Sequence, residues 1–231
     1  MNRPRLIVAL ATLAAGMLVL SCSSAIRQKQ EFFPGKQPKE QWSEAKDSTG
    51  NYVRHGKFVT WHENGQEKTD GEYQNGLKAG VWTTKDAQGC LVEWCEYEND
   101  ELHGLSVSYY PNKNKRQEGK YVHGKREGVW RQWFDNGNLK EDGAYINDQQ
   151  SCIWTSWYPG GQKKEECEYK AGLLDGTHTT WRENGLRWVE GAYKKGQKIG
   201  AWTTWDDMGL VFSQERYESG KLVNTTSASS Q

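Results

Sequence analysis

The chain has 231 residues, and its 30 lysines and arginines balance its 30 aspartates and glutamates. Binding to nucleic acid phosphates needs a basic stripe. No block of one sign stands out here, which argues against a nucleic-acid-binding protein. Hydrophobic residues make up 35% of the chain, and 12 tryptophans and 11 tyrosines outnumber 5 phenylalanines. Apolar area held in large rings with polar tips favours a thin, half-solvated structure over a compact aliphatic core.

Residues 1–21 predict an export signal. Two arginines precede an apolar run over residues 6–20, which is too short for a membrane span of roughly 20 residues and matches the core of a signal peptide. The run closes on the quartet Val19-Leu20-Ser21-Cys22. This quartet resembles the lipobox of bacterial lipoproteins, and the resemblance implies cleavage before Cys22 and acylation of that residue, palmitate included. The alternative is an ordinary signal peptide or short anchor with a chance cysteine.

The predicted lipid sets the expected location and the ends of the folded part. Several acyl chains exceed what stable anchoring needs, so we expect a protein anchored in the bacterial cell envelope. Ser23 after the cysteine resembles the outer-membrane sorting pattern, and the side of the membrane stays open. Polar residues 22–50 predict the lipidated cysteine and a flexible tether reaching about 25–30 Å. Residues 224–231 predict a disordered tail.

Between these ends, residues 51–223 form a tandem repeat of seven 24-residue units. Position 0 of the units is Gly56, Gly80, Gly104, Gly128, Cys152, Gly176 and Gly200. Position +17 is tyrosine in all seven: Tyr73, Tyr97, Tyr121, Tyr145, Tyr169, Tyr193 and Tyr217. Position +2 is Phe58, Trp82, Ser106, Trp130, Trp154, His178 and Trp202. Position +5 is also mostly aromatic. Chance does not hold a tyrosine in register seven times.

Two turn sites in each unit predict a β-hairpin. Position +9 is glycine in six of seven units, often after asparagine as in Asn136-Gly137, and Asn-Gly between aromatic segments is a strong hairpin signal. Position +20 is always glycine or aspartate, which enter the left-handed region easily. We therefore expect an all-β fold, an elongated single-layer antiparallel ribbon of fourteen strands. Residues 50–56 resemble the truncated end of a preceding unit, which would cap the ribbon.

The pattern Gly-x-Trp-x-x-Trp-x-x-Asn-Gly followed by Gly-x-Tyr-x-x-Gly resembles the variant MORN repeat, found in bacterial proteins named YwqK-type antitoxins. The resemblance covers residues 56–223 and implies a single-layer hairpin ribbon with a scaffold or interaction role. An antitoxin against a cytosolic toxin has no use for a lipobox. The third unit departs most, with Ser106 at +2 and Pro111 at the turn, and the second has Lys85 at +5 and Cys95 at +15. We expect these units to bend or locally disorder the ribbon.

The aromatic positions admit two interpretations. Their rings could form an exposed binding stripe, since Trp and Tyr are favoured at interfaces, or they could be the core of a thin sheet. Strict periodicity favours the core, because specific binding should break the symmetry in a few units. Residues His178, Trp94 and Trp188 are such breaks. The candidate binding surface is Trp82, Trp94, Trp130, Trp154, His178, Trp188 and Trp202.

Four cysteines remain besides Cys22, an even number in an oxidising compartment. With the hairpin turn near +8, Cys152 at position 0 and Cys167 at +15 lie on adjacent strands, one residue out of direct register. A disulfide between them is plausible there. The state of Cys90 and Cys95 stays open, since five residues along one strand separate them. No Cys-x-x-Cys pair or histidine cluster supports zinc.

No catalytic motif appears in the sequence. The five histidines are scattered, and no metalloprotease, nucleophile-elbow or phosphate-binding pattern is present. We therefore expect no enzyme, no catalytic residues, no metal and no cofactor. The leading hypothesis is a lipid-anchored envelope scaffold or protein-interaction surface. Binding of cell-wall or surface glycan by the aromatic stripe is the alternative, and an antitoxin or immunity role is a third. The partner and the oligomeric state stay open.

Overall fold

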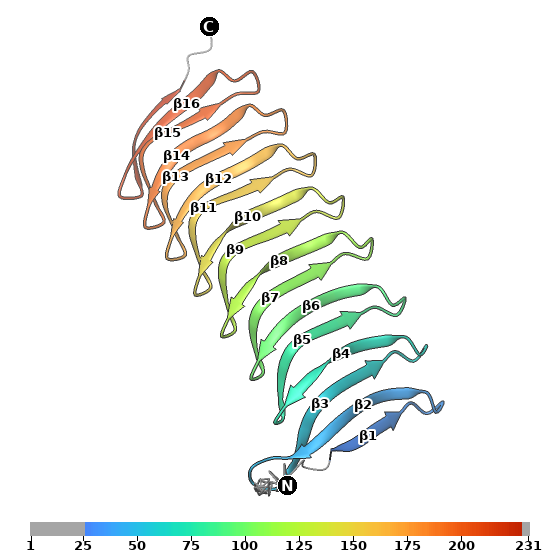
Figure 1. The fold of residues 1–231 in the computed structure, drawn as a ribbon. Coiled ribbons are helices and arrows are strands. Elements are labelled where there is room, and N and C mark those ends of the chain that lie inside the picture. The colour runs from blue at the N-terminus through green and yellow to red at the C-terminus, as the bar shows by residue number, and fades with distance from the viewer. Residues whose placement is uncertain (1–25, 228–231) are drawn as a thin grey trace, which may run out of the picture.

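The computed structural model describes residues 26–227, so the predicted signal peptide and Cys22 lie outside the described residues. These residues form one open antiparallel sheet in which each strand pairs with the next along the chain (Figure 1). The predicted all-β ribbon of hairpin repeats is confirmed. The strands are β1 (Arg27–Phe32), β2 (Pro38–Lys46), β3 (Tyr52–Trp61), β4 (Glu67–Gln74), β5 (Leu77–Lys85), β6 (Leu91–Glu98), β7 (Glu101–Tyr109), β8 (Lys115–Val122), β9 (Lys125–Trp133), β10 (Leu139–Ile146), β11 (Gln149–Trp157), β12 (Lys163–Lys170), β13 (Leu173–Trp181), β14 (Arg187–Lys194), β15 (Gln197–Trp205), β16 (Val211–Glu218) and β17 (Lys221–Ser227). Within residues 26–227 there is no helix long and apolar enough to cross a membrane.

Both predicted turn sites are turns in the structure. In the first unit, the His62 amide donates to the Gln66 carbonyl at 2.8 Å, and Gly65 has φ 85°. The second turn is Asn75-Gly76, where both residues have positive φ, as a tight hairpin requires. Each unit is therefore a hairpin, closed in the first unit by residues 62–66 and joined to the next unit by a shorter turn at residues 75–76.

A third site of positive φ lies at position 0, in the middle of the first strand of each unit. Gly128 has φ 72° and Cys152, the one non-glycine among the seven, has φ 61°. The pairing with the preceding strand shifts register beside this position, for example between Asp142 and Ala144. Such bulges bend a strand, which gives every hairpin the same curvature (Figure 1).

The sheet extends beyond residues 51–223, which corrects two expectations. The tether expected over residues 22–50 is wrong for β1 and β2, because β2 pairs with β3 through Trp42 and Phe58 and buries Ala45. The tail expected over residues 224–231 is wrong up to Ser227, because β17 pairs with β16. In both places the end of the repeat leaves an unpaired strand, and polar segments without periodicity can satisfy its backbone groups.

The third unit is regular, so the expectation of local disorder is wrong. At its turn Lys113 adopts φ 71° in the place of the usual glycine. The Tyr110 hydroxyl donates to the Trp133 carbonyl of the next unit at 2.9 Å. A lysine in the left-handed region costs about 1 kcal/mol or more, and the contacts with neighbouring units offset it.

The core of this single layer is an aromatic ladder, defined as the rings at positions +2 and +17. Four tryptophans at +2 are only 4–5% exposed: Trp82, Trp130, Trp154 and Trp202. Tyr145 lies edge-to-face between two of them, with ring centroids 6.2 Å from Trp130 and 4.9 Å from Trp154. For these rings the structural interpretation is confirmed.

Each buried tryptophan lies directly on a glycine at position +15 of the preceding strand. A Cβ placed on Gly143 would be 2.2 Å from Cδ2 of Trp154. The Trp154 Nε1 donates to the Ala144 carbonyl at 3.1 Å. The same glycine–tryptophan pairs are Gly71–Trp82, Gly119–Trp130 and Gly191–Trp202. Cysteine occupies +15 in two units where the partner on the following strand is not tryptophan, as in Cys95–Ser106 and Cys167–His178.

Candidate interaction surface

The residues of the predicted binding stripe do not form a continuous exposed surface. Its four +2 tryptophans are buried in the ladder, so their ring faces are not available to a ligand, which corrects that part of the prediction. The side chain of His178 is 13% exposed, and its Nε2 is 2.9 Å from Glu165 Oε1. Trp94 is half-buried. Of the predicted set, Trp188 alone is exposed.

The predicted disulfide between Cys152 and Cys167 is absent from the structure, in which the four cysteines of the described residues are free thiols. Cys152 faces Tyr169, and Cys167 faces Trp154. The two cysteines are thus two positions out of register, because facing positions within a hairpin sum to 17 rather than 16. Cys152 is exposed and Cys167 is buried.

Around Trp188 lies an exposed apolar surface, the turn patch, made of Leu186, Trp188, Met208, Leu210 and Phe212. These side chains are 37%, 45%, 76%, 61% and 62% exposed. They occupy positions +10 and +12 of unit six and +8, +10 and +12 of unit seven, at and just after the β13–β14 and β15–β16 turns. Large exposed apolar groups gathered in one place mark interaction sites more often than scattered ones do.

The turn patch breaks the symmetry of the repeat. In the fourth unit the equivalent positions +8, +10 and +12 are Asn136, Asn138 and Lys140, and the first, third and fifth units are also free of apolar side chains there. The second unit has Gln88, Cys90 and Val92. The hairpin fold therefore does not require these apolar residues, since other units make the same turn with polar ones.

The indole of Trp188 is held in place by Arg182. The guanidinium carbon lies 5.2 Å from the ring centroid. Arg182 Nη2 donates to the Trp205 carbonyl at 3.1 Å, and its Nη1 is 2.9 Å from Asp207 Oδ1. Because the ring is positioned before any partner arrives, binding loses less side-chain entropy. A preorganised, exposed tryptophan is typical of an interface hot spot.

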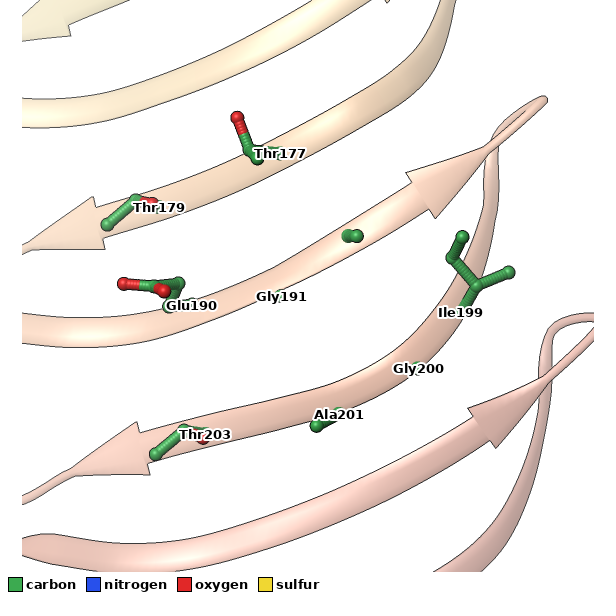
Figure 2. Close-up of a pocket in the computed structure, with 9 residues that line it drawn as sticks. Thr177, Thr179, Glu190, Gly191, Ile199, Gly200, Ala201 and Thr203 are labelled. Atoms are coloured by element: carbon green, nitrogen blue, oxygen red, sulfur yellow. The ribbon is translucent and has the colours of Figure 1, made fainter.

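A shallow hollow of about 510 Å³ lies over β13, β14 and β15 (Figure 2). It exists because small side chains such as Thr177 and Ala201 stand at +1, where units two to five have valine, leucine or isoleucine. Its one charged lining residue, Glu190, is 2.9 Å from Arg187 Nη1. A lining of small residues with a single paired carboxylate does not assemble a nucleophile with a base.

Burial favours the neutral forms of the thiol and phenol groups in and beside the ladder. Burial raises the pKa of the Cys167 thiol to about 11 and the pKa of the Tyr169 phenol to about 12. A hydrogen bond with His178 lowers the pKa of the Glu165 carboxyl. Across residues 26–227, no group of three or more His, Cys, Asp or Glu side chains is placed to hold a metal ion.

Comparison with known proteins finds a family match in four of the seven repeats. The family described as MORN repeat variant matches residues 54–75, 102–123, 126–147 and 153–171, which lie in units one, three, four and five. The match includes the third unit, which departs most from the pattern. The other three units share the period and the hairpin fold. Four segments of the chain therefore match the variant MORN repeat.

No curated protein matches the chain. Among solved structures, a chain of "Crystal Structure of TcdB2-TccC3-Cdc42" aligns with a TM-score of 0.24 and 10% sequence identity. The alignment covers 90% of this chain and 14% of that chain, so this protein spans about one seventh of its length. At that score the likeness carries no argument about fold or function.

Proposed function

We propose that this protein is a non-enzymatic scaffold of the bacterial envelope, anchored by lipid at Cys22, that binds a protein partner through the turn patch. One observation carries the proposal. Apolar side chains stand exposed at +10 and +12 of units six and seven and at +8 of unit seven, where most other units have polar ones.

The architecture suits an anchored scaffold. The N-terminal strands and the turn patch lie at opposite ends of the ribbon (Figure 1). At about 4.8 Å per strand, the distance from β1 to β16 is roughly 70 Å along the sheet. An anchor preceding β1 would therefore present the patch far from the membrane, beyond lipid headgroups and within reach of another envelope protein.

The chemistry of the patch favours a protein over a glycan. Four of its five members are Leu, Met or Phe, which complement an apolar protein surface, and Arg182 and Asp207 supply a charged rim. Sugar stacking needs exposed indole faces, and the tryptophans at +2 that the glycan alternative relied on are buried.

The repeat itself supplies the variant that tests this. Trp188→Lys, Leu210→Asn and Phe212→Lys replace patch residues by those of the fourth unit at the same positions, Lys140 and Asn138. We expect chemical crosslinking in intact cells to join the parent protein to a defined partner and the triple variant to lose that product.

The matched control removes exposed apolar area elsewhere. Val81→Thr with Ile153→Thr changes two exposed aliphatic residues at +1 to the threonine found there in unit six. This control should crosslink like the parent. Equal crosslinking by the patch variant and the parent would refute the proposed site.

A further inference from the structure

The C-terminal strand β17 is an edge of the described sheet that is exposed and nearly free of charge. All seven of its residues are exposed, and β16 is its only neighbour among the described strands. Leu222 and Val223 are 52% and 51% exposed. Residues 222–227 carry no charge, whereas the opposite edge strand β1 includes Arg27, Lys29 and Glu31. Natural sheets protect edges with charges, so β1 is protected and β17 is not.

The aromatic ladder also stops at β17. Tyr217 contacts Trp202 on one side, with ring centroids 6.3 Å apart. At the position of the next +2 ring, β17 has Thr226, and at position 0 it has Asn224. Terminal units of a repeat protein need a polar outer face. Here the last two strands, β16 and β17, instead expose Val211, Leu222 and Val223. These exposed apolar residues indicate that another surface covers this end of the sheet.

The direction of the strands decides how a second copy can add. Neighbouring strands are antiparallel throughout the described sheet, so β1 and β17, both odd-numbered, run the same way. A copy added head-to-tail by translation would place its β1 parallel to β17. A copy related by a two-fold axis perpendicular to the sheet would place its β17 antiparallel to the first and keep the aromatic ladder on the same face.

We propose that two copies of this chain join end to end through β17, forming one continuous antiparallel sheet about a two-fold axis. Each copy covers the exposed apolar residues of the other and the β17 backbone groups that pair with no strand within residues 26–227. Because residues 222–227 are uncharged, the pairing brings no like charges together. A two-fold contact closes on itself, so it gives a dimer rather than a fibre. This inference is independent of the turn patch.

Sedimentation velocity of residues 23–231, which contain the whole described sheet, tests the dimer. We expect twice the monomer mass at micromolar concentration. Val223→Lys with Thr225→Lys places charges on the edge and should raise the dissociation constant at least tenfold. The matched control, Gln28→Lys with Gln30→Lys, places the same charges on β1 and should leave the dimer unchanged. A parent that stays monomeric up to about 100 μM, or that grows in mass without limit, would overturn the proposal.

A second measurement holds even if the lysine variant loses its edge strand. Near a two-fold axis a residue meets its own copy, so single cysteines at Val223, Asn224 and Thr225 should form intermolecular disulfides on mild oxidation. The background carries Cys152→Gly, which removes the exposed thiol. The same substitution of Gln28 or Gln30 should give no crosslink. Crosslinking through β1, or at none of the β17 positions, would contradict the two-fold arrangement. Retained partner crosslinking by the β17 variants would separate this outcome from that of the turn patch.

Discussion

Gly143→Ala tests whether the buried tryptophans depend on the glycines beneath them. The new Cβ would lie 2.2 Å from Trp154 Cδ2 and 2.3 Å from Cε2, whereas carbon atoms in contact prefer about 3.5–4.0 Å. The ring must therefore move by more than 1 Å. It is 4% exposed, and its Nε1 is bonded to the Ala144 carbonyl. Overpacking plus a weakened hydrogen bond predicts a loss of about 2–4 kcal/mol in the free energy of unfolding.

The repeat also supplies a compensating change. In the next unit, Cys167 at +15 faces His178 at +2 of the following strand. A residue larger than glycine at +15 is therefore tolerated when the ring on the following strand is smaller than tryptophan. Gly143→Cys alone should lower the free energy of unfolding at least as much as Gly143→Ala does. Combined with Trp154→His it should cost at least about 1 kcal/mol less than the sum of the two single changes.

Urea unfolding followed by tryptophan fluorescence, with hydrogen exchange of β10 and β11 amides, measures both effects. The control is Gly35→Ala, where no atom lies within 4 Å of the added Cβ and φ is not positive; it should be nearly neutral. An equal loss at Gly35 and Gly143, or strict additivity of the pair, would show that the glycine–tryptophan contact does not govern stability.

Four further outcomes follow from the same structure. Cys152→Gly should raise the free energy of unfolding by about 0.5–1 kcal/mol, because Cys152 holds φ 61° where the other units have glycine; an unchanged urea midpoint would count against strain there. Burial raises the pKa of Cys167 to about 11 from 9.0, so folding favours the neutral thiol. The contribution of this thiol to the free energy of unfolding is complete below pH 9 and is lost as pH rises from 9 to 11. Cys167→Ser should therefore flatten the fall in thermal midpoint over that range. At neutral pH a maleimide should label exposed Cys152 long before Cys167, and equal rates would contradict the burial. Asn136→Ala should lower the free energy of unfolding by about 1 kcal/mol, because the Asn136 Nδ2 donates to the Pro159 carbonyl at 2.9 Å and the Oδ1 accepts from the Asn138 amide at 2.9 Å. Asn136→Asp keeps only the acceptor and should recover part of this loss in the same urea assay.

Much of the fold could be predicted from spacing. A period of 24 residues with two turn sites leaves room for two short strands, and a glycine at +9 supplies the positive φ of the first turn, as at Gly65 and Gly137. Local chain geometry therefore determines the hairpin, its length and its order along the ribbon. The same spacing did not predict β1, β2 and β17, because these strands form by pairing with the ends of the sheet and not from a pattern of their own.

The candidate site was only partly visible in the sequence. Trp188 was recognised as a break in the repeat, but Met208, Leu210 and Phe212 were missed. Comparing positions +8, +10 and +12 across the units would have found them, since polar residues fill these positions in most other units. The predicted Cys152–Cys167 disulfide was wrong because the hairpin turn was centred half a position too early. That offset moves the facing residues of the two strands out of register.

The sequence by itself determined the hairpin unit, its repetition and the residues that turn the chain, because these depend on φ preferences and spacing within about 24 residues. Only the tertiary structure decided which rings are buried. A tryptophan at +2 becomes core through the glycine and tyrosines of neighbouring strands, whereas Trp188 stays exposed because it lies beside a turn. Burial depends on what the adjacent hairpins place around a ring, and periodicity alone does not contain that information.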